Sequence, residues 1–104
     1  MEKLWIDDLR QPPKGWHWAK TSTEAIALIE KNYYETISFD HDLGGEDTST
    51  RILSWMAGNL SEGWWPTKIM VHSANPVGAQ NLMWLAKDYA PVTTLVQRVT
   101  VSGS

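Results

Sequence analysis

Short apolar stretches alternate with longer amphipathic ones along the 104 residues of the chain. The first apolar stretch, Lys3–Asp8 (KLWIDD), stops abruptly at two acids. This pattern is typical of a buried strand whose carboxyl end reaches solvent. Two prolines follow in residues 10–15, where the missing N–H donors disfavour both a strand and a helix. We therefore expect a first strand and then a loop.

An edge strand and a helix are predicted next. Residues 16–20 alternate between apolar and polar side chains, which favours a second strand at the edge of a sheet. Residues 21–24 (TSTE) have the spacing of a capping box, so a helix should begin there. Its apolar face continues to about Asn32.

The same pattern of strand and helix then recurs. Thr36–Asp42 again ends an apolar run in charge, and the turn-forming Leu43–Gly45 follows it. Residues 46–50 are polar and can cap a helix, because apolar side chains recur at helical spacing from Ile52 to Leu60. This segment therefore predicts a third strand followed by a second helix.

A fourth strand, a third helix and a fifth strand complete the pattern. Lys68–Val71 is apolar and leads to Asn75, a good N-cap, with Pro76 suited to the first helical position. Pro91 should end that helix. Residues 93–101 alternate and predict the last strand.

Strands separated by helices predict an α/β fold with right-handed crossovers and a parallel sheet covered on both faces. We therefore expect a three-layer open sheet of about five strands. The first crossover has no helical segment, yet about seven residues at about 3.3 Å each can return over a strand of about four residues. One domain is expected over residues 1–101, with a flexible tail over 102–104.

Composition narrows the classes of function. The chain has no cysteine, which excludes disulfides, thiolate nucleophiles and cysteine-bound zinc and favours a cytoplasmic location. No segment is apolar enough to predict a membrane span, and the N-terminus does not resemble a signal peptide. A net charge of -3 with scattered basic residues argues against a long nucleic-acid track. A small phosphate-bearing ligand or a nucleic-acid end remains compatible with this charge.

Acidic side chains follow two of the predicted strands. Asp7 and Asp8 end the first strand, and Asp40 and Asp42 end the third. Because the carboxyl ends of parallel strands share one rim, these acids should meet where ligands bind in open sheets. Their mutual repulsion favours a divalent cation, with Mg²⁺ or another such as Mn²⁺ suited to oxygen ligands. Each acid could alternatively cap a turn or be solvated.

Two histidines also end predicted strands. Because imidazole groups in general titrate near neutrality, His41 and His72 could act as base and acid on a phosphodiester. A single histidine near a core is more often a hydrogen-bonded structural residue, and we assign His17, in the edge strand, to that class. Of the three histidines, the sequence thus favours His41 and His72 as members of the site.

Residues 73–75 precede the third predicted helix, whose N–H groups and dipole favour anions. No nucleophile elbow surrounds Ser73, so we do not expect it to act as a nucleophile. We expect its hydroxyl to contact a phosphate instead. Asn75 would cap the helix whether or not a ligand binds, so its contact with phosphate is the weaker expectation.

The order of these motifs resembles that of receiver domains of two-component signalling, which have an acidic pair after the first strand, an aspartate after the third and a hydroxyl after the fourth. Asp7–Asp8, Asp40 and Ser73 occupy those places. The resemblance implies a flavodoxin-like fold with strand order 2-1-3-4-5, magnesium at the acids and phosphorylation of Asp40. The lysine of receivers after the fifth strand has no match in residues 93–98, and the first helix is missing.

The motifs LWIDDLRxPP, SFDHDLGG and VHSANP are together more similar to the cyclic-phosphate processing receiver family. The added histidines of this family are proposed to act on cyclic phosphates, including those left by RNA damage. The resemblance implies a magnesium-dependent phosphoesterase, a hydrolase acting on a cyclic nucleotide or on a 2′,3′-cyclic phosphate at an RNA end, with a place in RNA repair. The alternatives are a phosphoacceptor receiver and a non-catalytic module that binds a nucleotide or a protein.

The resemblance, taken with the residues, predicts four groups in the site. They are Asp7, Asp8 and Asp40 for the metal; His41, His72 and Asp40 for catalysis; Ser73 and Asn75 for the phosphate; and Asp42 in a supporting role.

Overall fold

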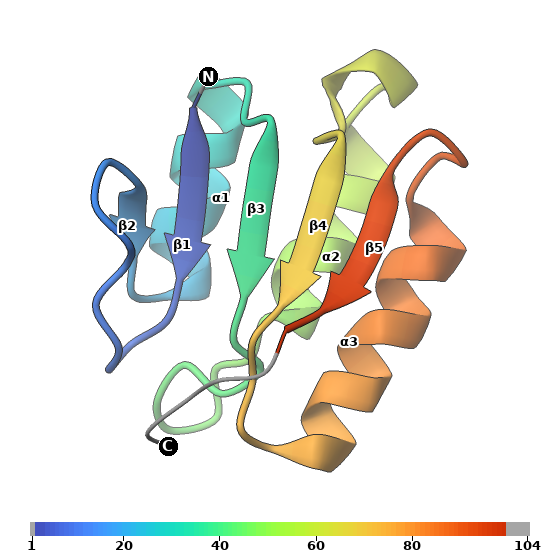
Figure 1. Ribbon diagram of the computed structural model, residues 1–104. Helices are drawn as coiled ribbons and strands as arrows, with labels where there is room; N and C mark the ends of the chain where they lie inside the picture. Colours follow the sequence, from blue (N-terminus) through green and yellow to red (C-terminus); the bar gives the residue numbers. More distant parts are fainter. Residues whose placement is uncertain (1, 100–104) are drawn as a thin grey trace.

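The computed structural model describes residues 2–99, and its centre is a parallel five-stranded sheet (Figure 1). Along the chain the elements are β1 (Lys3–Ile6), β2 (His17–Ala19), α1 (Ser22–Lys31), β3 (Thr36–Phe39), α2 (Thr50–Asn59), the 3-10 helix η1 (Glu62–Trp64), β4 (Lys68–Val71), α3 (Pro76–Tyr89) and β5 (Leu95–Arg98). The strand order β2-β1-β3-β4-β5 confirms the flavodoxin-like topology. The predicted tail at 102–104 lies outside the described residues.

The first crossover has no helix, as the sequence predicted. Residues 7–16 join β1 to β2, and the two strands pair in parallel. Two contacts hold β2 at its first residue: His17 Nδ1 lies 2.8 Å from the Tyr34 hydroxyl, and His17 Nε2 lies 2.8 Å from Glu2 Oε2. These contacts agree with a structural assignment for His17.

The three-layer detail of the prediction is corrected, because the three helices lie on the same face of the sheet. Helix α2 packs against both α1 and α3, and Figure 1 shows α1 and α2 behind the strands. Right-handed crossovers explain this arrangement. The connections β2 to β3, β3 to β4 and β4 to β5 all run in one direction across the sheet, and only the helix-free connection runs back. Within residues 2–99, no helix covers the other face.

The hydrophobic core lies between the sheet and this helical layer. In β1 and β4 every second residue is buried, so one side of each strand faces the helices. Both predicted caps form: the Thr21 side chain accepts from the Glu24 N–H, and Asn75 Oδ1 accepts from the Gly78 N–H at 3.1 Å. Caps of this kind fix where α1 and α3 begin.

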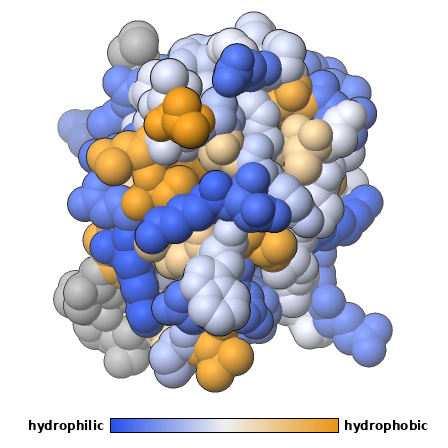
Figure 2. Space-filling model, turned by 90° about the vertical axis from the view of Figure 1, so that its right-hand side faces the viewer, coloured by the Kyte–Doolittle hydropathy of each residue, from blue (hydrophilic) through white to orange (hydrophobic). Residues whose placement is uncertain are grey.

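Exposed apolar side chains remain near α3 and β5, where Figure 2 shows hydrophobic residues among hydrophilic ones. The exposed apolar side chains of this region are Val77, Trp84, Tyr89, Val92 and Leu95. In the described part of the chain, no helix is both long enough and apolar enough to cross a membrane.

Candidate functional site

The site begins where β1, β3 and β4 end at a common rim. Both acidic strands are shorter than predicted, since β1 ends at Ile6 and β3 at Phe39. The backbone nevertheless continues to pair for one more residue: the Asp7 N–H donates to Ala19, and the Asp40 N–H donates to Ile6. These bonds hold Asp7 and Asp40 side by side at the edge of the sheet.

Three of the predicted acids gather as expected. Asp7, Asp8 and Asp40 each offer a carboxylate oxygen, and these oxygens lie within 4.8 Å of one another. Asp7 is fully buried, Asp40 is 7% exposed and Asp8 is half-buried. The arrangement therefore places three carboxylates close together, two of which are largely shielded from water.

Asp7 is held from two sides. Its Oδ1 accepts hydrogen bonds from the N–H groups of Leu9 at 2.8 Å and Arg10 at 2.9 Å. Its Oδ2 lies 3.0 Å from His72 Nε2. The two backbone bonds also explain why β1 stops, because the Asp7 side chain takes the N–H groups that a longer strand would use.

His72 lies behind Asp7. It is only 1% exposed, and its Nδ1 lies 2.6 Å from the Ser38 hydroxyl oxygen. Burial lowers the pKa of His72, although the hydrogen bond and the charge of Asp7 act in the opposite direction. The neutral ring that results donates from Nε2 to Asp7, which is an acceptor when ionised, and accepts at Nδ1 from Ser38.

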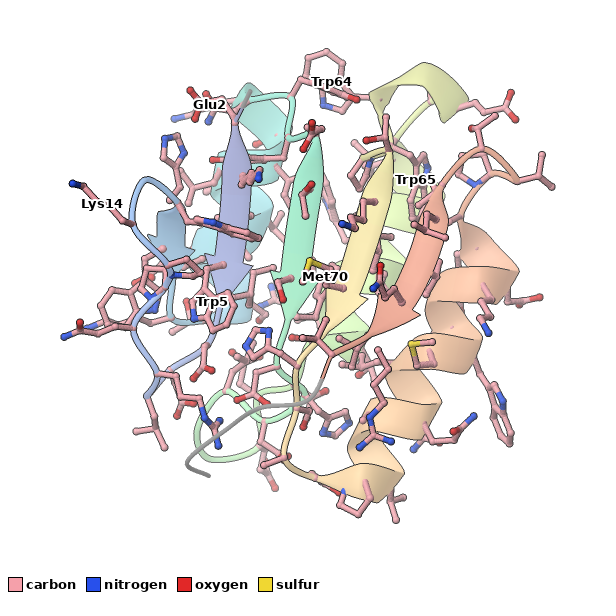
Figure 3. All side chains as sticks on the ribbon, in the orientation of Figure 1. Glu2, Trp5, Lys14, Trp64, Trp65 and Met70 are labelled. Carbon is pink, nitrogen blue, oxygen red and sulfur yellow. The ribbon has the colours of Figure 1, made fainter. Side chains whose placement is uncertain are left out.

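Trp5 covers the ring of His72. The two rings are stacked, with centroids 3.8 Å apart and planes 7° apart. Figure 3 shows Trp5 and Met70 on the face of the sheet that carries no helix. His72 is thus enclosed by Trp5, Ser38 and Asp7, and the two nitrogens of its ring are both engaged.

The surroundings of Asp40 disfavour the charged form of its carboxyl group. Its pKa is raised to about 6, first by burial and then by the charge of Asp7. Hydrogen bonds from the Ser73 side chain and the His41 backbone, and the charge of Arg10, lower it in part. The Ser49 hydroxyl also donates to the backbone carbonyl of Asp40 and fixes the chain there. Repulsion between buried carboxylates therefore remains in this protein.

His41 points to α3. A Cβ atom placed on Gly78 would lie 2.5 Å from His41 Cγ, so the imidazole packs directly on the first turn of the helix. The side chain is 16% exposed, and its Nδ1 lies 3.1 Å from Asp42 Oδ1. The two predicted catalytic histidines are therefore separated, with His72 buried behind Asp7 and His41 at the start of α3.

An open cavity of about 460 Å³ lies over the rim. It is lined by Asp8, Leu9, Arg10, Asp40, Asp42, Gly44, Gly45, Ser73, Ala74 and Asn75. Most of the predicted site residues therefore face one space, while the rings of His41 and His72 do not line it among the described residues. Asp7 lies directly below, in contact range of Asp8 and Asp40.

The side of the cavity opposite β1 is formed by the start of α3. Ser73 Oγ accepts from the Asn75 N–H at 3.1 Å, and Asn75 Nδ2 donates to Asp42 Oδ2 at 3.1 Å. The hydrogen bond from Asn75, followed by that with His41, lowers the pKa of Asp42. Asn75 therefore both caps the helix and holds Asp42 at the cavity.

Sequence reasoning missed three residues of this environment. Arg10 enters the cavity from a loop that was interpreted only as a connection. Ser38 is fully buried and contacts His72 Nδ1, and the ring of Trp5 stacks on the ring of His72. A weak signal existed for Ser38, because it is a polar residue between the apolar Ile37 and Phe39 of a buried strand.

A family model described as a cyclic-phosphate processing receiver domain matches residues 2–88, which include every residue of the cavity. No curated protein and no solved structure matches the chain.

Proposed function

The chain belongs to the cyclic-phosphate processing receiver family, and we propose that it is a metal-dependent phosphoesterase that opens cyclic phosphates of nucleotides or RNA ends. Membership of the family connects the fold with cyclic-phosphate processing. The observation that carries the rest of the proposal is the cluster of Asp7, Asp8 and Asp40, whose carboxylate oxygens lie within 4.8 Å of one another beside an open cavity.

The chemistry of the three acids fits a divalent cation. All donors are oxygens, and burial together with the charge of Asp7 raises the pKa of Asp40, a penalty that a bound cation would relieve. We assign Asp7, Asp8 and Asp40 to Mg²⁺ or Mn²⁺. When bound, such an ion would polarise a phosphoryl oxygen and lower the pKa of a water molecule.

The phosphate would bind between the acids and the start of α3. Ser73 offers a hydroxyl there, and Ala74 and Asn75, which directly precede the first turn of α3, line the same cavity. A helix start binds anions through partial charges. Phosphate binding of this kind is compatible with an acidic protein.

Hydrolysis needs one proton to be removed and one to be supplied. The oxygen of water forms a bond to phosphorus, one ribose oxygen leaves, and that oxygen takes up a proton to give a phosphomonoester. We propose that His41 exchanges these protons with the cavity through Asp42, which lines the cavity and engages His41 Nδ1. His72 would contribute through Asp7, whose carboxylate it orients.

The decisive assay uses 2′,3′-cyclic nucleotides and RNA with a cyclic phosphate end. We expect a phosphomonoester, detected by phosphorus NMR, with Mg²⁺ or Mn²⁺ but not with chelator. Asp40→Asn should abolish the reaction, whereas Asp88→Asn, on the exposed end of α3, should not. Absence of turnover with every cyclic nucleotide and metal tried would refute catalysis.

The same preparations separate the two alternative functions. A phosphoacceptor receiver would form a hydroxylamine-sensitive acyl phosphate on Asp40 after treatment with acetyl phosphate. A non-catalytic module would bind a cyclic nucleotide tightly and release it unchanged.

A further inference from the structure

Arg10 is the cation closest to the acidic cluster among the described residues. Its Nη1 lies 3.8 Å from Asp7 Oδ2 and 3.9 Å from Asp40 Oδ2. These distances exceed those of direct hydrogen bonds, so the guanidinium faces both carboxylates without binding either one tightly. Its position is that of a counter-ion shared by two acids.

The backbone of Arg10 is fixed by two hydrogen bonds, whereas its side chain is partly exposed and makes only long contacts. The Arg10 N–H donates to Asp7 Oδ1 at 2.9 Å, and its carbonyl accepts from Trp5 Nε1 at 2.9 Å. The side chain is 30% exposed and lines the cavity together with Ser73 and Asn75. A change of side-chain rotamer would therefore move the guanidinium across the cavity without moving the loop.

A bound divalent cation and this guanidinium cannot occupy their places together without repulsion. The cation would lie about 2.0–2.6 Å from carboxylate oxygens. Arg10 Nη1 now lies less than 4 Å from two of the carboxylates in question. Two positive groups this close repel each other strongly in a partly buried site.

From these contacts we infer that Arg10 is an exchangeable counter-ion: it balances Asp7 and Asp40 in the metal-free protein, and it turns to the phosphate when a divalent cation binds. The planar guanidinium matches the oxygens of a phosphate, and the metal would free it for that contact. This inference rests on the proposed metal site. It adds a phosphate-binding residue on the β1 side of the cavity, opposite Ser73.

The test measures two affinities in the full chain. Arg10→Gln keeps the backbone contacts and a polar side chain but removes the charge. We expect the metal-free variant to bind Mn²⁺ roughly tenfold more tightly than the wild type in calorimetry at constant ionic strength. The Mn²⁺-loaded variant should bind inorganic phosphate roughly tenfold more weakly.

Lys14→Gln is the matched control. It removes the same charge from the same loop, and Figure 3 shows Lys14 directed away from the rim. Its Mn²⁺ and phosphate affinities should equal those of the wild type. Arg10→Met provides a second uncharged variant with the same two expectations, and Arg10→Lys should bind Mn²⁺ nearly as the wild type does.

Two outcomes would overturn the inference. One is Mn²⁺ affinity that is unchanged or weaker in both uncharged Arg10 variants, and the other is phosphate affinity that they leave unchanged. If the proposed metal site is itself wrong, the result is different, because Asp40→Asn would then bind Mn²⁺ as well as the wild type does. If Asp40→Asn loses Mn²⁺ while the Arg10 variants match the wild type, only the inference about Arg10 fails.

Discussion

The core under the sheet and the rim at the strand ends are both buried, but burial has opposite effects in the two regions. Under the sheet, Phe39, Ile52 and Leu82 are fully buried and apolar, and their burial stabilises the fold. At the rim, Asp7 and Asp40 are nearly as buried, and burial raises the pKa of Asp40 instead. Burial of carboxylates at the rim therefore lowers stability, whereas burial of apolar side chains in the core raises it. Substitutions in the two regions should separate effects on stability from effects on metal binding.

The largest effect is expected in the core. Leu82→Ala should lower the free energy of unfolding by about 2–5 kcal/mol, because it removes buried methyl groups and leaves a cavity. The rise in Tm caused by Mg²⁺ should stay the same, since Leu82 lies on α3 away from the rim. Val92→Ala, at a fully exposed position, is the control and should change stability by less than about 0.5 kcal/mol. A smaller metal response in Leu82→Ala would show that the two regions are coupled.

The second effect tests the enclosed histidine. His72→Ala leaves Ser38 and Asp7 without their partner, so it should cost about 2–3 kcal/mol of stability. It should also weaken Mn²⁺ binding about tenfold, because Asp7 loses its orientation. His72→Gln can replace the Nε2–H donor and should recover part of the Mn²⁺ affinity. Equal Mn²⁺ affinities in the alanine and glutamine variants would contradict a positioning role.

A third substitution should raise stability while removing function. The folded pKa of Asp40, about 6, lies above its ordinary value of 3.8. Protonated Asp40 therefore favours the folded state. This contribution to stability is fully present below pH 3.8 and is lost as the pH rises through 6. At neutral pH and without metal, the free energy of unfolding of Asp40→Asn should therefore exceed that of the wild type by about 1–2 kcal/mol.

Chemical denaturation across pH, with and without Mg²⁺, measures this prediction. The stability gain of Asp40→Asn should disappear near pH 4, and the stabilisation by Mg²⁺ should be absent at every pH. A variant less stable than the wild type at pH 7.5 would show that the carboxylate of Asp40 is already well balanced in the metal-free protein.

The smallest effect on stability concerns His41. Gly78→Ala places a methyl group within 2.5 Å of His41 Cγ, so the imidazole must move. Helix propensity favours alanine by about 1 kcal/mol, which offsets part of the clash. We expect a net loss of about 1 kcal/mol of stability, unchanged Mn²⁺ affinity and roughly tenfold slower hydrolysis of a cyclic phosphate.

Gly58→Ala is the matched control for this substitution. Gly58 lies in α2, and a Cβ there meets no atom within 4 Å. The control should gain about 1 kcal/mol and hydrolyse substrate at the wild-type rate. If Gly78→Ala also hydrolysed at that rate, His41 would not be the group that transfers protons.

Much of the fold was predictable, because its signals are local. Apolar runs ending in acids marked β1 and β3, and Asn75 with Pro76 marked the start of α3. The prediction of helices on both faces was wrong. It treated α/β alternation as sufficient, whereas the face of each helix depends on the direction in which its crossover runs.

The gathering of Asp7, Asp8 and Asp40 was also determined by the sequence, since residues that end parallel strands must meet at one rim. Only the tertiary structure decided how His72, Ser38 and Arg10 relate to them. Their contacts join residues as far as 65 positions apart in the chain, and they depend on side-chain direction and burial. Topology brings strand ends together, but packing alone selects which side chain faces the cavity and which supports it from behind.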